Sequence, residues 1–289
     1  QCPGQLGRMG ITGVVHGAEG KMHVLSLVVA SYEKDTEDTG FGKPNRRGND
    51  MAIQTRSVEY THEGELLEAQ LAWDDAQTGP RPGVLVCHAF RGREAFENGR
   101  AQELAKLGYV GFALELYGKG VVASDVEQAY ALLSRFTGDR DLLQARLAAS
   151  IEVAAAQDEI DPDHLAAIGY CFGGLCALDI ARGGQAVRGV CSFHGLLSKP
   201  EAPTAPIAAR VLVEHGWDDP MVPPEQVLDF AEEMNGAGAD WQLHAHGHTV
   251  HAFTNPGAND AAAGTVYREA ADRRSWQSLQ NFLAELFTA

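Results

Sequence analysis

The segment GYCFG (169–173) places a cysteine between two glycines, each two residues away from it. An apolar run over 165–170 precedes the cysteine, and helical spacing follows over 175–181. A strand that turns sharply into a helix needs glycines at these positions, because a Cβ there would collide with neighbouring backbone. The turn presents the thiol at the carboxyl edge of a sheet, beside a helix N-terminus whose dipole favours the thiolate. We therefore expect Cys171 to be an acyl nucleophile, with burial as a small apolar side chain as the alternative.

A cysteine nucleophile needs a base and an acid that orients it, and in α/β hydrolases the chain order is nucleophile, acid, base. The pattern G-x-x-D-x-x-V-P (216–223) follows a predicted strand and indicates Asp219 as the acid. The adjacent Asp218 is expected to face solvent or to cap a turn. His251, on the loop after the last predicted strand, is the expected base, and His248 is the second choice.

Three histidines alternate at positions 244, 246 and 248 and would share one face of an extended chain, as metal ligands can. No carboxylate or cysteine accompanies them in the sequence, and Gly247 interrupts the strand. No C-x-x-C spacing occurs among the five cysteines. We therefore expect no metal and no cofactor.

Strands and helices alternate from residue 51 onward. Short apolar or alternating runs predict strands at 57–61, 66–73, 83–88, 109–114, 165–170, 187–193, 210–215 and 241–245. Helical spacing predicts helices at 94–107, 140–157, 175–181, 223–236 and 275–287, and a further helix that begins with Ser124 as N-cap and Glu127 in a capping box. This order predicts the α/β class, with a mostly parallel central sheet and helices on both faces.

Composition narrows the function further. The formal net charge is −16, which disfavours nucleic acid and anionic membranes as partners. No apolar run reaches the roughly 20 residues of a membrane span, and no secretory signal is evident. The odd cysteine count argues against a disulfide scaffold and favours the cytoplasm. Residues 1–50 are rich in glycine and have no sustained period, so we expect a poorly structured, upstream N-terminal extension before a single domain over 51–289, with Met51 as a natural start.

Four segments together resemble the dienelactone hydrolase family: LELYGKG (114–120), GYCFGG (169–174), HGWDDPMVP (215–223) and HAFTNP (251–256). The resemblance covers roughly 51–289. It implies an α/β-hydrolase fold and a triad of Cys171, Asp219 and His251. It also implies an oxyanion hole formed by the backbone N–H groups of Phe172 and Phe90.

The substrate-binding positions depart from the family pattern. The glutamate that holds the thiol in dienelactone hydrolases is replaced by Ala89. Of the two arginines that clamp the substrate carboxylate, the first aligns with Lys119 and the second with Asn255. Arg91 and Arg93 are nearby candidates to replace them.

The expected reaction is hydrolysis of a small-molecule carboxylic ester or (enol-)lactone through a thioester, by a monomer or weak homodimer. A general short-chain carboxylesterase or thioesterase is the alternative within the same chemistry. A non-catalytic binding protein on a hydrolase scaffold is the alternative of another class. Glutamine amidotransferases also carry G-x-C-x-G, but they expect a His-x-Glu that His251-Ala252-Phe253 lacks.

Overall fold

The computed structural model describes residues 13–16, 22–25, 52–201 and 204–288. Strands β1 (Gly13–His16) and β2 (Met22–Leu25) form a short antiparallel pair. The rest of the predicted N-terminal extension, and Met51, lie outside the described residues. Among the helices that the structure describes, none combines the length and apolar character needed to cross a bilayer.

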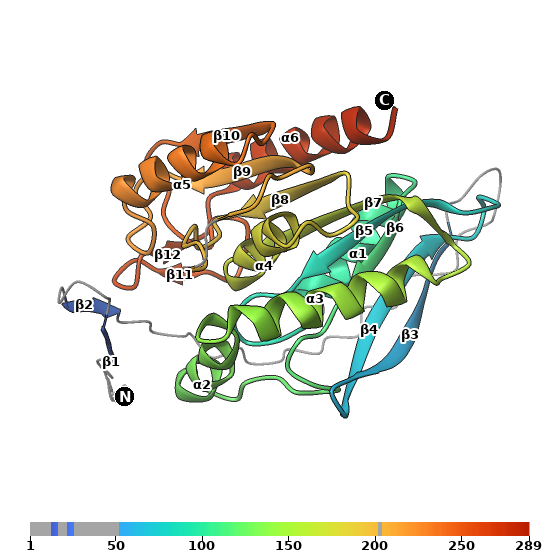
Figure 1. The fold of residues 1–289 in the computed structure, drawn as a ribbon, viewed down its shortest axis with the longest axis horizontal. Coiled ribbons are helices and arrows are strands. Elements are labelled where there is room, and N and C mark those ends of the chain that lie inside the picture. The colour runs from blue at the N-terminus through green and yellow to red at the C-terminus, as the bar shows by residue number, and fades with distance from the viewer. Residues whose placement is uncertain (1–12, 17–21, 26–51, 202–203, 289) are drawn as a thin grey trace, which may run out of the picture.

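An eight-stranded sheet forms the centre of the domain, in the order β10-β9-β8-β7-β5-β6-β4-β3 (Figure 1). The strands from β10 to β6 pair in parallel, and the β3–β4 hairpin joins β6 in the antiparallel sense. The predicted, mostly parallel sheet is therefore confirmed. The strands are β3 (Ile53–His62), β4 (Glu65–Asp74), β5 (Arg81–Cys87), β6 (Val110–Ala113), β7 (Ile160–Tyr170), β8 (Gly189–Phe193), β9 (Arg210–Gly216) and β10 (Trp241–His246).

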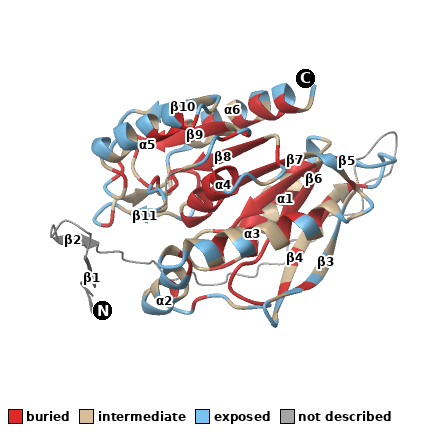
Figure 2. Ribbon diagram, viewed as in Figure 1, coloured by how far each residue is buried: buried red, intermediate tan, exposed pale blue. Residues whose placement is uncertain are grey.

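Helices cover both faces of this sheet. The helices are α1 (Ala95–Lys106), α2 (Val126–Thr137), α3 (Arg140–Ala155), α4 (Phe172–Arg182), α5 (Pro224–Gly236) and α6 (Glu269–Thr288). One apolar layer joins α3, α4 and α5 to the sheet, and a second joins α1 and α6 to its other face. Successive residues of β5 alternate between the layers, with Leu85 in the first and Val86 in the second. Figure 2 shows α4 and the central strands as the most buried elements. The strand-to-helix turn at Cys171 therefore joins two elements that are packed in the core.

Two local features differ from the sequence prediction. The N-cap of α2 is Asp125 rather than Ser124: the Asp125 carboxylate accepts from the Gln128 N–H at 2.8 Å, and the Gln128 side chain accepts from the Ser124 N–H at 2.7 Å. A carboxylate is a stronger acceptor than a hydroxyl, so the helix begins one residue later. The short strands β11 (Asn259–Asp260) and β12 (Thr265–Val266) were not predicted, because two residues cannot show an alternating pattern.

Candidate active site

Cys171 occupies the sharp turn between β7 and α4. Its backbone has φ 56° and ψ −116°, a strained conformation for a residue with a side chain, and its N–H donates to the Phe193 carbonyl at 3.1 Å. Cys171 is partly exposed, whereas Cys87, Cys176 and Cys191 are buried. Among the described cysteines, the turn therefore makes the Cys171 thiol the accessible one.

The flanking glycines are required by close backbone contacts. A Cβ on Gly169 would lie 1.9 Å from the Gly173 carbonyl oxygen, and a Cβ on Gly173 would lie 2.1 Å from the Cys87 carbonyl oxygen. Real Cβ atoms do not approach other atoms so closely, so the collisions expected from the sequence are confirmed. The second contact shows that the first turn of α4 packs directly against the end of β5.

Asp219 and His251 come together from two loops that follow β9 and β10. The Asp219 carboxylate oxygen Oδ2 lies 2.8 Å from His251 Nδ1, and both side chains are buried. The second oxygen of Asp219 accepts from the Met221 N–H at 2.8 Å, which orients the carboxylate. Asp218 points toward solvent with 49% of its side chain exposed, as expected, and it lies 3.7 Å from the exposed His248.

Cys171 and Asp219 set the electrostatics of His251. Burial lowers the pKa of the imidazole, but the charge of Cys171 and the charge and hydrogen bond of Asp219 outweigh it and raise the pKa to about 10. Nε2 of His251 forms no hydrogen bond within the described part of the chain. The contact with Asp219 thus engages Nδ1 and leaves Nε2.

The two backbone N–H groups expected to bind an oxyanion belong to Phe172 and Phe90. Neither Phe172 N–H nor Phe90 N–H forms a hydrogen bond among the described residues. Phe172, directly after Cys171, is the first residue of α4, and Phe90 lies on the loop after β5. The Phe90 carbonyl accepts from the Tyr117 hydroxyl at 3.0 Å, which holds this loop. The close approach of Gly173 to the end of β5 brings the two donor segments next to each other.

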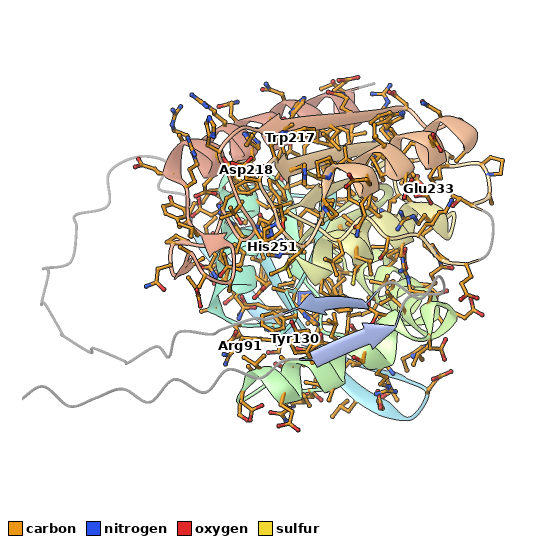
Figure 3. The ribbon with its side chains drawn as sticks, turned by 90° about the vertical axis from the view of Figure 1, so that its left-hand side faces the viewer. Arg91, Tyr130, Trp217, Asp218, Glu233 and His251 are labelled. Atoms are coloured by element: carbon orange, nitrogen blue, oxygen red, sulfur yellow. The ribbon has the colours of Figure 1, made fainter. Side chains whose placement is uncertain are left out.

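Tyr130 of α2 is a site residue that the sequence analysis missed. Burial, and then the charge of Cys171, raise the pKa of its phenol. That hydroxyl is buried and has no hydrogen-bond partner among the described residues. In Figure 3, Tyr130 and Arg91 lie on one side of His251, and Trp217 and Asp218 lie on the other. No pattern in the sequence distinguishes Tyr130 from other residues of an amphipathic helix.

His194, at the end of β8, was also missed. Its ring packs edge-on against the His251 ring with centroids 5.0 Å apart, and its Nε2 lies 2.8 Å from the Thr254 hydroxyl. Burial and the nearby His251 hold the pKa of His194 well below the usual value, so this imidazole is neutral. A polar residue directly after a buried strand was a usable signal, since this edge of a parallel sheet is where ligands bind.

The alternating histidines at 244, 246 and 248 were expected to have no carboxylate beside them, and this expectation is wrong. A carboxylate does accompany them: the buried Glu214 of β9 binds His244 Nδ1 at 2.9 Å and His246 Nε2 at 2.7 Å. The sequence could not show this pairing, because it arises from the parallel register of β9 and β10. His248 lies beyond the strand with 92% of its side chain exposed, so it neither joins the pair nor faces Cys171. No group of three metal-ligating side chains is arranged around a common centre in the described chain.

Lys119 and Asn255, which were expected to bind substrate, form contacts within the protein instead. The Lys119 ammonium lies 2.5 Å from Glu59 and 3.6 Å from Glu68 on the β3–β4 hairpin. Asn255 closes a turn by accepting from the Gly257 N–H at 2.9 Å. These contacts give no support to a carboxylate clamp at either position.

The other two predicted substrate residues lie on the loop after β5. Arg91 donates to the Ala123 carbonyl at 2.9 Å, and its Nε lies 3.4 Å from Glu94. The Ala89 N–H donates to the buried Glu97 carboxylate at 3.2 Å. Ala89 thus contributes to the loop that carries Phe90, and its methyl group offers no polar contact.

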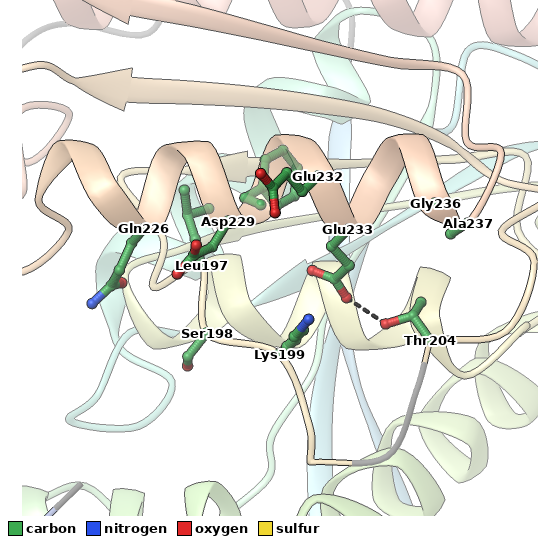
Figure 4. A pocket seen from close by; sticks show the side chains of 11 residues that line it. Leu197, Ser198, Lys199, Thr204, Gln226, Asp229, Glu232, Glu233, Gly236 and Ala237 are labelled. Atoms are coloured by element: carbon green, nitrogen blue, oxygen red, sulfur yellow. Dashed lines mark hydrogen bonds between the residues drawn. The ribbon is translucent and has the colours of Figure 1, made fainter. Parts of the chain in front are cut away.

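A separate cavity of about 690 Å³ lies between α5 and the loop after β8 (Figure 4). It contains none of the predicted site residues. Glu233, on its wall, is committed to an ion pair with Arg182 at 2.7 Å and a hydrogen bond from Thr204 at 2.6 Å. The cavity is therefore separate from the chemistry at Cys171.

The parallel sheet, the cysteine turn and the Asp–His pair at its carboxyl edge define the class of α/β hydrolases. The family model of the dienelactone hydrolase family matches residues 67–287, and the chain belongs to this family.

Solved structures and a curated relative agree with this assignment. The chain is 36% identical to the structure named m3DLH (TM-score 0.79), over 82% of this chain and 99% of that one. It is 34% identical to the dienelactone hydrolase-like promiscuous phosphotriesterase P91 from metagenomic libraries (TM-score 0.78), over 81% and 99% of the two chains. It is 26% identical, over 81% of its length and 96% of the relative, to the "Probable 2-oxo-3-(5-oxofuran-2-ylidene)propanoate lactonase" of Bradyrhizobium sp..

Proposed function

We propose that this protein hydrolyses carboxylic esters or enol lactones by forming a thioester on Cys171. The observation that carries the proposal is the buried 2.8 Å contact between Asp219 and His251, whose second ring nitrogen is left for the strained Cys171 turn. A nucleophile, a base and an orienting acid in this chain order are the parts that acyl transfer needs.

In the acylation step, the Cys171 sulfur attacks the ester carbonyl while His251 carries the proton. The raised pKa of His251 makes its imidazole a strong acceptor for the thiol proton as the sulfur attacks. The oxyanion is held by the N–H groups of Phe172 and Phe90, each worth about 3 kcal/mol in the transition state. The imidazolium then protonates the departing alcohol or enol.

In the deacylation step, His251 removes a proton from water that attacks the thioester. Acylation removes the negative charge of the sulfur, so Asp219 becomes the main group that raises the pKa of His251. Water addition releases the acid and restores the thiolate. Since thiolate is itself a good leaving group, we expect activated esters and enol lactones to be preferred over alkyl esters and amides.

The surroundings favour a small neutral or weakly polar acyl group. Lys119 and Arg91 have their charges compensated by neighbouring carboxylates. The Tyr130 hydroxyl, in contrast, has no partner and is available to a polar atom of the substrate. General carboxylesterase or thioesterase activity thus remains the alternative to a dienelactone substrate, and a phosphate triester is a further compound to test because of the relative P91.

The proposal is tested with Cys171→Ala and Cys171→Ser on 4-nitrophenyl acetate, beside a dienelactone and a neutral aryl ester. We expect kcat/KM to fall by at least about a thousandfold with the melting temperature unchanged. In the wild type, iodoacetamide should abolish activity in step with alkylation of the Cys171 peptide, which mass spectrometry separates from the other cysteines. Full activity in Cys171→Ala would exclude the mechanism. Ligand binding without turnover in the wild type would favour the binding-protein alternative.

We place the reaction in the cytoplasm. The described cysteines at 87, 171, 176 and 191 are all free thiols, as a reducing compartment permits. The substrate is a small molecule, and the acidic chain has no charge complementarity to nucleic acid or to an anionic membrane.

A further inference from the structure

The β11–β12 hairpin binds the backbone of His251 through both its N–H and its carbonyl group. The His251 N–H donates to the Gly264 carbonyl at 2.9 Å, and the Val266 N–H donates to the His251 carbonyl at 3.2 Å. His251 also forms a parallel bridge with Thr265. His251 is therefore hydrogen-bonded like a residue in a strand, although the loop that carries it forms no strand at this position.

The same hairpin touches the loop that carries the acid. Gly264 has φ +66°, and a Cβ on it would lie 2.3 Å from Cγ and 2.8 Å from Cδ of Pro220. Pro220 directly follows Asp219, so one hairpin residue contacts both the acid loop and the base loop.

Further hydrogen bonds stiffen the hairpin. The Asp260 carboxylate accepts from the N–H groups of Ala262 and Ala263, both at 2.9 Å. The Arg268 N–H donates to the Phe253 carbonyl at 3.0 Å, which ties the far end of the hairpin back to the base loop.

The base loop needs such support because its backbone is strained. His248 and Ala252, on either side of His251, have φ +55° and +57°, a region that side chains disfavour. Without an external contact the loop would relax, and His251 would move with it.

We propose that the β11–β12 hairpin is a clamp that sets the separation between the Asp219 carboxylate and the His251 imidazole, with Gly264 as its positioning residue. The clamp rests on the proposed function for its catalytic consequence, since it acts through His251. Gly264 touches no reacting atom.

A loosened clamp should change the pKa of His251 in a predictable direction. The groups that face the His251 ring are Cys171, Asp219, the neutral His194 and His215. The hairpin contacts the loops of both Asp219 and His251, and Asp219 raises the pKa of His251. A longer separation therefore lowers that pKa, moves the acid limb of kcat to lower pH and weakens the base in deacylation.

The test compares Gly264→Ala with Gly238→Ala. Gly238 has nearly the same backbone, φ +65°, but a Cβ there would meet nothing within 4 Å, so it controls for the cost of a left-handed residue. We expect both variants to lose stability. Only Gly264→Ala should lower kcat, by about tenfold to a hundredfold as for a small misplacement of a catalytic group, with KM little changed. Its acid limb should move to lower pH. Equal kcat and equal pH profiles in the two variants would overturn the clamp.

A second variant and a second readout keep the test decisive. Asp260→Ala removes the two hydrogen bonds of the hairpin turn without adding atoms, and it decides the question if Gly264→Ala does not fold. NMR titration of the His251 ring in a Cys171→Ala background needs no activity: both hairpin variants should lower its pKa relative to Gly238→Ala, and an unchanged pKa would refute the clamp. Retained esterase activity of Cys171→Ala would instead refute the proposed function, so the two failures are distinguishable.

Discussion

The two halves of the candidate site are built in different ways. The nucleophile half is centred on one continuous segment, where Gly169 contacts the Gly173 backbone and Gly173 contacts the end of β5. The acid–base half joins Asp219 and His251 from separate loops, 32 residues apart, with a small hairpin touching both. The first half depends on close backbone contacts within the core, and the second depends on contacts between loops.

This difference predicts how each half should fail. A side chain added at either glycine of the nucleophile turn meets backbone that cannot move, so it should cost stability first. A change in the acid–base half meets side chains and loops that can shift, so it should cost activity and change pH dependence while the fold survives.

The largest effect is expected from Gly169→Ala. Its Cβ would overlap the Gly173 carbonyl, so we expect the free energy of unfolding to fall by more than about 3 kcal/mol, measured by urea denaturation. Gly99→Ala in α1 is the matched control: a Cβ there meets nothing within 4 Å, and the change should raise stability by about 0.5–1 kcal/mol. Similar effects of the two changes would contradict the steric origin of the turn.

Asp219→Asn should spare the fold and damage the chemistry. The amide keeps the shape but loses the charge that supports the His251 imidazolium, so kcat should fall by about 10³–10⁴-fold. Asp218→Asn, one residue earlier and half exposed, should leave kcat within a factor of two or so. If both aspartates mattered equally in steady-state assays, the assignment of the acid would be wrong.

The pH profile tests the charge balance of the acid–base half. Burial lowers the pKa of His251, and Cys171 and Asp219 raise it more, to about 10. For an alkyl ester whose alcohol must be protonated as it leaves, kcat/KM should therefore stay level above neutral pH and fall only as pH passes about 10. Asp219→Asn should move this alkaline limb to lower pH. A wild-type limb near the ordinary histidine value of 6.5 would show that the anionic neighbours do not act on His251 as inferred.

The smallest effect is expected from Lys119→Ala. The ammonium is exposed and compensated by Glu59 and Glu68, so its loss should not change the ratio of kcat/KM for an anionic lactone to that for a neutral aryl ester. Tyr130→Phe is the informative comparison, since its buried hydroxyl has no hydrogen-bond partner among the described residues. A selective loss of the anionic substrate in Lys119→Ala would restore the carboxylate clamp.

Much of the fold could be predicted because its signals are local. Continuous apolar runs separated by helical spacing predicted the parallel strands from β5 to β10, and these are confirmed. The cap of α2 was misplaced by one residue, since Ser124 and Asp125 both have capping side chains and only the folded geometry chooses between them. The β11–β12 hairpin could not be predicted, because strands of two residues show no alternating pattern.

The sequence by itself determined the strand–turn–helix at Cys171, because glycine spacing and apolar patterning act over a few residues. It also identified the aspartate and histidine that meet. Only the tertiary structure decided that Glu214 pairs with His244 and His246, that Lys119 is compensated by the β3–β4 hairpin, and that Tyr130 and His194 lie at the site. The physical reason is that these relations depend on the register of neighbouring strands and the packing of distant elements, which no short stretch of residue types encodes.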